Sequence, residues 1–188
     1  MLYGKRIAIS LLASFLELFA VVSGFAQAPP KVFIDRGACP FEGCTYRRWT
    51  VTSDTALYGQ PEGTKPVGEV HKGETVDAID GEVHVVPTPM TVVFNHEDFH
   101  RGDRVYLLTY LGEGFMEVWF EGKISVEEVL FLFTGDDLWP TCLQASADCW
   151  GRIEKREPFD WWILIKPHQG KSGWTKESDH FGEKDLYE

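Results

Sequence analysis

The sequence has few basic residues and no long run of them. Eighteen Lys and Arg stand against 29 Asp and Glu, which gives a formal net charge of -11 at pH 7. No basic run is longer than the pair Arg47-Arg48. Because a chain this acidic repels nucleic-acid phosphates and anionic lipid headgroups, we expect neither nucleic acid nor a membrane surface as a partner.

Several familiar catalytic motifs are also missing. The sequence contains no G-x-S-x-G nucleophile elbow, no phosphate-cradling glycine loop and no dinucleotide fingerprint. A cysteine peptidase needs a free, activated thiol beside a histidine, whereas each of the four cysteines has a candidate disulfide partner. The sequence therefore predicts a protein that is not an enzyme and has no cofactor.

The first 26 residues have the pattern of a secretory signal peptide. Lys5 and Arg6 precede an apolar run that ends in small residues, and we expect cleavage after Ala26. The run is long enough for an uncleaved membrane anchor to be the alternative, but Glu17 interrupts it. We expect a secreted or periplasmic protein that has no membrane attachment after cleavage.

The cysteines lie in two close pairs, Cys39 with Cys44 and Cys142 with Cys149. An even number of cysteines in an exported chain predicts disulfides, here with three possible pairings. We favour the local pairing because both spacers hold turn-forming or small residues; the competing pairing would join the N-terminal segment to the later loop. A zinc site is disfavoured, since these spacers are longer than the usual knuckle spacing and the compartment is oxidising.

Most of the mature sequence consists of short β-branched and aromatic runs separated by glycine and proline. Two hairpins stand out, at residues 104–120 and at Trp161 to Thr175. The one candidate helix is 125–134, where Ser125 and Glu128 fit a capping box, although the same stretch could be a strand. We predict an all-β fold with at most one short helix.

Three segments, in order, resemble a bacterial SH3-like domain, a small exported barrel of about five strands. The strand Trp49-Thr50-Val51 and the turn-rich loop after it resemble the family's first strand and long loop. Residues 67–76 are similar to its hydrophobic stretch with spaced glycines, and residues 162–174 to its last two strands. The resemblance implies a small barrel closed by the second hairpin.

The resemblance also implies a division of the chain and a function. A linker with the first cysteine pair occupies 27–45, the SH3-like barrel 46–178 and a C-terminal tail 179–188. An inserted β-hairpin region at about 87–158 is foreign to the plain domain, and two interleaved barrels are the alternative. Family members bind cell-wall peptides or proteins, so the resemblance implies a non-catalytic binding module with a protein or cell-wall peptide as partner. No oligomeric state is predicted.

Adjacent residues of a strand point to opposite faces, so Trp161 and Trp162 are not expected to point inward together. The outward ring, with Tyr58 or Trp174, would line a shallow groove. The alternative is that this ring covers the inserted hairpin. We take Tyr58, Trp161 and Trp174 as the candidate ligand-binding residues.

The stretch from His96 to His100, HEDFH, is a literal match to the H-E-x-x-H motif. In zinc peptidases this spacing places both histidines on one helix face, with the Glu as general base. Here β-type runs on both sides leave room for about one helical turn, so a metal site at His96 and His100 is disfavoured. A zinc-dependent hydrolase is nevertheless the alternative function, and a structural envelope protein without a ligand is the second alternative.

Overall fold

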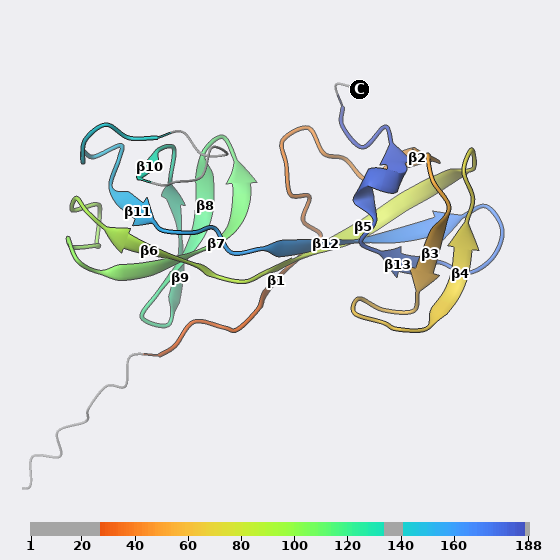
Figure 1. The fold of residues 1–188 in the computed structure, drawn as a ribbon, viewed down its shortest axis with the longest axis horizontal. Helices are drawn as coiled ribbons and strands as arrows, with labels where there is room; N and C mark the ends of the chain where they lie inside the picture. Colours follow the sequence, from red (N-terminus) through yellow and green to blue (C-terminus); the bar gives the residue numbers. More distant parts are fainter. Residues whose placement is uncertain (1–26, 134–140, 187–188) are drawn as a thin grey trace, which may run out of the picture.

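The computed structural model describes residues 27–133 and 141–186 (Figure 1). The predicted signal peptide lies outside the described residues. Within them the chain forms strands and one 3-10 turn, η1 (Ser178–His180). The prediction of an all-β fold with at most one short helix is confirmed. In this described part, no helix has the length and apolar character needed to cross a membrane.

The first sheet has eight strands and combines distant parts of the chain. It encloses its own core cluster, in which Trp49, Ile163 and Ile165 are fully buried. The N-terminal strand β1 (Phe33–Arg36) pairs with β5 outside the main order of strands. That order is β14 (Phe181–Gly182), β2 (Arg48–Val51), β5 (Thr75–Val85), β12 (Phe159–Pro167), β13 (Gly173–Thr175), β3 (Thr55–Tyr58) and β4 (Pro66–Val70).

The second sheet has six strands and comes from one continuous part of the chain, residues 88–153. Its core cluster is separate and contains the fully buried side chains of Met90, Leu132 and Trp150. The strand order is β10 (Leu132–Phe133), β11 (Gly151–Ile153), β6 (Thr88–Val92), β7 (Arg104–Gly112), β8 (Phe115–Phe120) and β9 (Lys123–Glu128). Strands β6 to β9 are consecutive antiparallel neighbours.

The second sheet is inserted between β5 and β12, which pair along their lengths in the first sheet. Its residues fall within the stretch that the sequence analysis assigned to an insertion, at about 87–158. Val86 N–H donates to the carbonyl of Pro158 at 3.2 Å, so the chain enters and leaves the second sheet at adjacent points. In Figure 1 the second sheet lies at one end of the long strands β5 and β12, and strands β2, β3, β4 and β13 of the first sheet lie toward their other end.

The candidate helix at 125–134 is not formed, and the alternative of a strand is the correct one, because the described residues form β9, a short connection and β10. Ser125 pairs with Val118 and Glu128 with Phe115 on the neighbouring strand β8. Both residues are therefore held in an extended strand, where a capping box cannot form. Cross-strand pairing outweighs the local helix signal, which is a weak one.

Both disulfides are local. Cys39 bonds to Cys44 and Cys142 to Cys149, with Cα atoms 5.7 and 6.1 Å apart. The prediction of disulfides is confirmed with the favoured pairing. Two such bonds fit an oxidising, extracellular compartment.

The two ends of the described chain contribute to the first sheet. The segment expected to be a linker, 27–45, supplies β1, and the expected tail, 179–188, supplies β14. Strand β1 pairs with β5, and strand β14 pairs with β2. Their short length and mixed composition gave no local strand signal.

Candidate functional site

Trp161 and Trp162 are both buried, so the prediction that one of the two lies on a surface is wrong. Trp161 is 7% exposed, packs in the core of the first sheet and donates its indole N–H to the Tyr46 hydroxyl at 2.9 Å. Trp162 is 3% exposed on the opposite face of β12, where Tyr58 meets it edge to face. The prediction failed because the loop carrying Glu62 covers that outer face, and the Trp162 indole donates to Glu62 at 3.3 Å.

The three predicted ligand residues do not form one groove. Tyr58 lies opposite Trp174 in the sheet, and Trp174 lies opposite Leu164, so Tyr58 and Trp174 share the outer face with Trp162. Trp161 points into the core on the other side. On the outer face the ammonium of Lys176 lies over the Trp162 ring, 5.9 Å from its centroid. The structure therefore places the aromatic face beneath polar neighbours.

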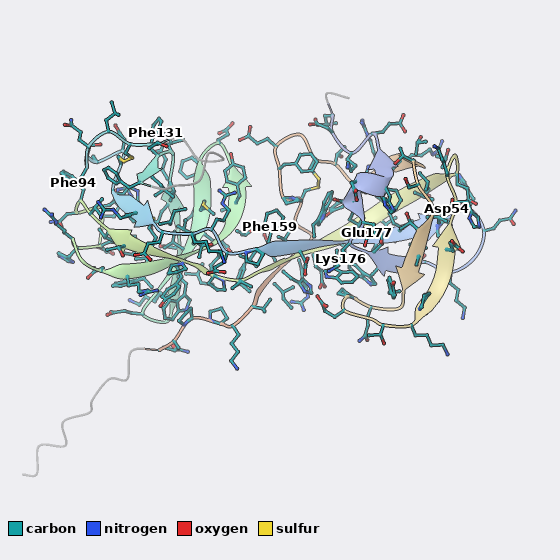
Figure 2. All side chains as sticks on the ribbon, viewed as in Figure 1. Asp54, Phe94, Phe131, Phe159, Lys176 and Glu177 are labelled. Carbon is teal, nitrogen blue, oxygen red and sulfur yellow. A yellow bond between two sulfur atoms is a disulfide. The ribbon has the colours of Figure 1, made fainter. Side chains whose placement is uncertain are left out.

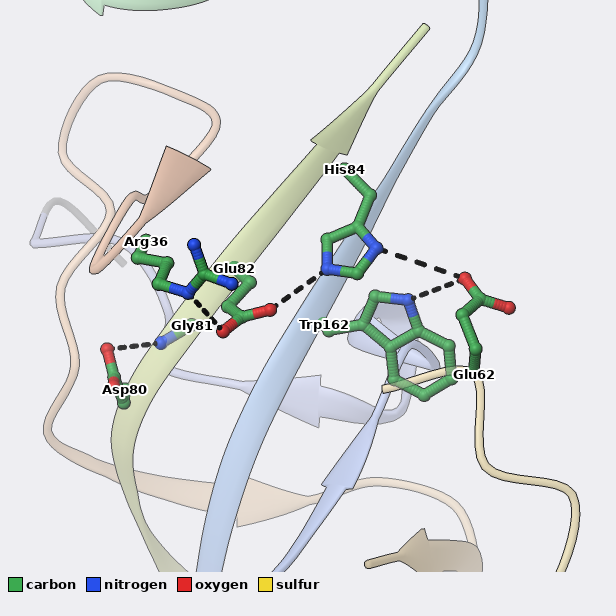
Figure 3. A network of polar contacts seen from close by, with 7 residues as sticks. All are labelled: Arg36, Glu62, Asp80, Gly81, Glu82, His84 and Trp162. Atoms are coloured by element: carbon green, nitrogen blue, oxygen red, sulfur yellow. Dashed lines mark hydrogen bonds and ion pairs between the residues drawn. The ribbon is translucent and has the colours of Figure 1, made fainter. Parts of the chain in front are cut away.

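A network of polar and charged side chains crosses this same outer face (Figure 3). Arg36 pairs with Glu82 at 3.2 Å, and Glu82 contacts His84 Nε2 at 3.0 Å. Glu62 lies 4.0 Å from the other ring nitrogen of His84. Because the two carboxylates lie at opposite nitrogens of one ring, a single cation could not contact all three groups. The network is best explained as tying β1 and the Glu62 loop to β5.

The HEDFH stretch forms a tight turn rather than a helix. His96 and Phe99 exchange backbone hydrogen bonds of 3.0 and 2.7 Å, and Glu97 has φ 45°. The His96 ring stacks on Trp150 with centroids 4.3 Å apart, while His100 is exposed. The two histidines therefore lack the helical arrangement that the zinc motif requires.

Two groups of three metal-capable side chains lie close together among the described residues, and neither includes His96 or His100. Both groups are at the surface, where close acidic groups are common without an ion. In the second group the His180 ring already contacts the Thr55 hydroxyl at 3.0 Å. We assign them no role; they are Asp54 with Glu69 and His71, and Glu177 with Asp179 and His180.

A cavity of about 550 Å³ lies between the two sheets. Phe159, labelled in Figure 2, lines it where β12 begins. Ligand sites of proteins have volumes of this order and predominantly apolar walls. The apolar wall residues are Val83, Val85 and Phe159 from the first sheet and Leu107, Leu108, Met116, Val129, Leu130 and Ile153 from the second sheet and its connections.

One edge of the cavity is closed by Glu42, which belongs to the loop of the first disulfide. Its Oε1 accepts the Tyr110 hydroxyl at 2.5 Å and the Glu113 N–H at 2.7 Å. These two donors hold the pKa of Glu42 below its ordinary value, and the bond to Glu42 raises the pKa of Tyr110. The N-terminal loop is thereby attached to the β7–β8 turn of the second sheet.

Two threonines in the cavity wall are buried. Thr88 accepts a hydrogen bond from the Glu157 N–H at 3.0 Å. Thr109 is 4% exposed and lies where the pairing of β7 with β8 shifts register, between Leu107 and Tyr110. Within the part of the chain that the structure describes, the Thr109 hydroxyl has no hydrogen-bond partner. The wall thus contains a buried hydroxyl to which the described residues give no hydrogen-bond partner.

Sequence reasoning missed the cavity because its walls come from segments far apart in the chain. Two local signals at its edge were available but were not used. Glu42 lies inside a short disulfide loop, and Glu113 stands between two glycines in a hairpin turn.

No protein-family model matches the chain, and comparisons with curated proteins and with solved structures give no significant match.

Proposed function

We propose that the chain is an exported, non-catalytic binding module of the SH3-like type, with a peptide segment of a protein or of the cell wall as ligand. The ligand would occupy the cavity between the sheets. The observation that carries this proposal is the cavity itself, about 550 Å³ with walls from both sheets. Its size and apolar lining are those of ligand sites in other proteins.

Other features support the export and the SH3-like assignment. The signal-peptide pattern and both disulfides favour passage into an oxidising compartment, periplasmic or outside the cell. The segments that resemble the family supply β2, β4, the start of β5, β12 and β13. All of these strands belong to the first sheet, and β5, β12 and β13 are consecutive neighbours within it.

The two alternatives have less support. A zinc-dependent hydrolase requires a helical HEDFH stretch, and this stretch is a turn with His96 stacked on Trp150. A structural envelope protein without a ligand does not account for a large apolar cavity, nor for the buried Thr109 hydroxyl in its wall, which has no partner among residues 27–133 and 141–186. Neither alternative explains why a cavity lies between the two sheets.

The test uses the mature chain, residues 27–188, labelled with ¹³C at its methyl groups. N-acetyl-phenylalaninamide, a neutral apolar probe, is titrated into it. We expect shift changes at the cavity methyls of Val83, Leu107 and Met116. The matched controls are Val51 and Val70, which are buried in the core of the first sheet and should not respond.

Each contrary result favours one alternative. Unchanged cavity methyls at millimolar probe would overturn the proposal and favour a structural protein. Stoichiometric zinc that is lost in a His96→Ala variant would favour the hydrolase.

A further inference from the structure

We infer that the cavity selects a cationic peptide segment of a protein, with a Lys or Arg side chain against Glu42 and Glu113 and an apolar side chain between the sheets. This inference rests on the proposed function, because it names the ligand class of the same cavity.

The charge at the cavity edge is the first support. Glu42, Glu113, Glu157 and Arg156 are the charged side chains of its described lining, three acids and one base. The Glu113 N–H donates to Glu42, so the two acidic residues lie together at one edge of the cavity. We call Glu42 and Glu113 the acidic corner. A cation at this corner would offset their mutual repulsion, and the chain's formal charge of -11 adds to the attraction.

The carboxylates of this corner are also available to a cation. Glu42 uses Oε1 for both of its hydrogen bonds, and Oε2 takes part in neither. The bonds to Tyr110 and to the Glu113 N–H lower the pKa of Glu42 and so favour its ionised form. Glu113 lies at the tip of the β7–β8 turn with φ 52°, and among the described residues its carboxylate has no hydrogen bond or ion pair. A ligand ammonium or guanidinium would find two available carboxylates there.

The Thr109 hydroxyl is the second and independent support. A buried hydroxyl without a partner destabilises a protein, and such groups are rare in folded chains. Thr109 lines the cavity at the register shift of β7, next to Tyr110, whose hydroxyl binds Glu42. A peptide backbone in the cavity could offer this hydroxyl the partner that the described residues do not supply.

The apolar part of the ligand follows from the walls. Leu130 and Phe159 line the cavity and remain 37% and 48% exposed. A large apolar side chain of a peptide would cover both and contact Val85 behind them. Exposed apolar surface of this kind favours a partner that has apolar and charged groups side by side.

The experiment compares three capped pentapeptides with a central phenylalanine flanked by two lysines, two glutamines or two glutamates. Binding to the mature chain is measured by calorimetry. We expect the lysine peptide to bind about tenfold more tightly than the glutamate peptide. Glu113→Gln should reduce that preference severalfold, and so should Glu42→Gln, which keeps an acceptor for Tyr110. Glu121→Gln is the matched control, because Glu121 lies in the β8–β9 turn with φ 48° but does not line the cavity.

A further variant tests the hydroxyl. Thr109→Val keeps the shape of the side chain and removes the unsatisfied group, so we expect an equal or higher melting temperature together with weaker binding of all three peptides. Unchanged affinity in this variant would overturn the role of Thr109.

The remaining outcomes separate this inference from the proposed function. Equal affinity for the three peptides, or a lysine preference that survives in Glu42→Gln and Glu113→Gln, would overturn cationic selection while the cavity remains a binding site. An equal loss of preference in Glu121→Gln would show an effect of net charge alone and would also overturn it. Failure of every peptide, together with unchanged cavity methyls, would overturn the proposed function itself.

Discussion

The two sheets achieve similar cores from very different parts of the chain. The first needs β1 near the start of the described chain and β14 near its end, with β5 and β12 in its middle. The second is formed by residues 88–153 alone, mostly through consecutive hairpins. Each has one fully buried tryptophan, Trp49 in the first and Trp150 in the second. The comparison teaches that the stability of the second sheet depends on one continuous segment and can change independently. The first sheet is stable only when segments far apart in the chain pair with one another.

Replacing either buried tryptophan is expected to have the largest effect. Trp49→Ala and Trp150→Ala should each cost about 3–5 kcal/mol of the unfolding free energy, because each leaves a large void in its core. Since the cores are separate, we expect Trp150→Ala to reduce amide-exchange protection in the second sheet only. Equal loss of protection in both sheets would show that they unfold as one unit.

Alanine substitutions at two glycines, one in each sheet, are expected to have the next largest effects on stability. A Cβ at Gly173 would lie 2.8 Å from Leu57 Cβ and 2.9 Å from the Tyr58 carbonyl, and neither can move without shifting strand β3. A Cβ at Gly151 would meet the sulfur of Met90, on a flexible side chain, and Leu132. Gly173→Ala should therefore cost about 3 kcal/mol and Gly151→Ala about 1 kcal/mol, measured by chemical denaturation. The reverse order would contradict this account of the packing.

Removing the disulfides is expected to have a smaller effect that differs between the two regions. By the chain-entropy model, replacing Cys39 and Cys44 by serine should cost about 2 kcal/mol, and replacing Cys142 and Cys149 a similar amount. Only the first pair holds the Glu42 loop, so only its loss should also weaken ligand binding at the cavity. Equal effects of both double variants on affinity would contradict a role of the loop in the site.

Alkaline pH should act on the first sheet. Burial raises the pKa of Tyr46 to about 12, and its hydroxyl contacts Trp161 and the Ala38 carbonyl. Because the folded state keeps this proton where the unfolded state loses it, the stability is complete below pH 10 and is lost as the pH rises toward 12. Denaturation measured across this range should show the decline, and Tyr46→Phe should reduce it.

Acid should have the smallest effect, and it should act on the contact between the two regions. The pKa of Glu42 is lowered, so its contribution is present above the ordinary value of 4.5 and is lost as the pH falls through the lower folded value. We expect the Tyr110 and Glu113 resonances to shift in this acid range while those of Trp49 stay constant. Glu42→Gln is the control, because its amide does not titrate.

Features with a local cause could be predicted from the sequence. The hairpins at 104–120 and 161–175 follow from alternating strand residues around turns that contain glycine, and the disulfides follow from short spacers. The HEDFH turn followed from the β-type runs beside it. In each case the deciding residues are neighbours in the chain.

Features that depend on tertiary cover could not be predicted. Nothing near Trp162 in the sequence shows that Glu62, a hundred residues earlier, closes the outer face. Val83 reads as an ordinary inward strand residue, and only the position of the second sheet makes it a cavity wall. The helix signal at Ser125 was overridden in the same way, by pairing with β8.

The adjacency of Val86 and Pro158 has a consequence for how such a chain can evolve. One hydrogen bond joins Val86 and Pro158, which flank the second sheet, so a short turn between them would give a plain β5–β12 hairpin. A gene could therefore gain, exchange or lose the coding region for the second sheet at a single point, with the pairing of β5 and β12 preserved. The cavity would exist only in the composite chain. Natural selection for a ligand would then act on the junction between two modules, and either sheet could diverge as long as the junction is maintained.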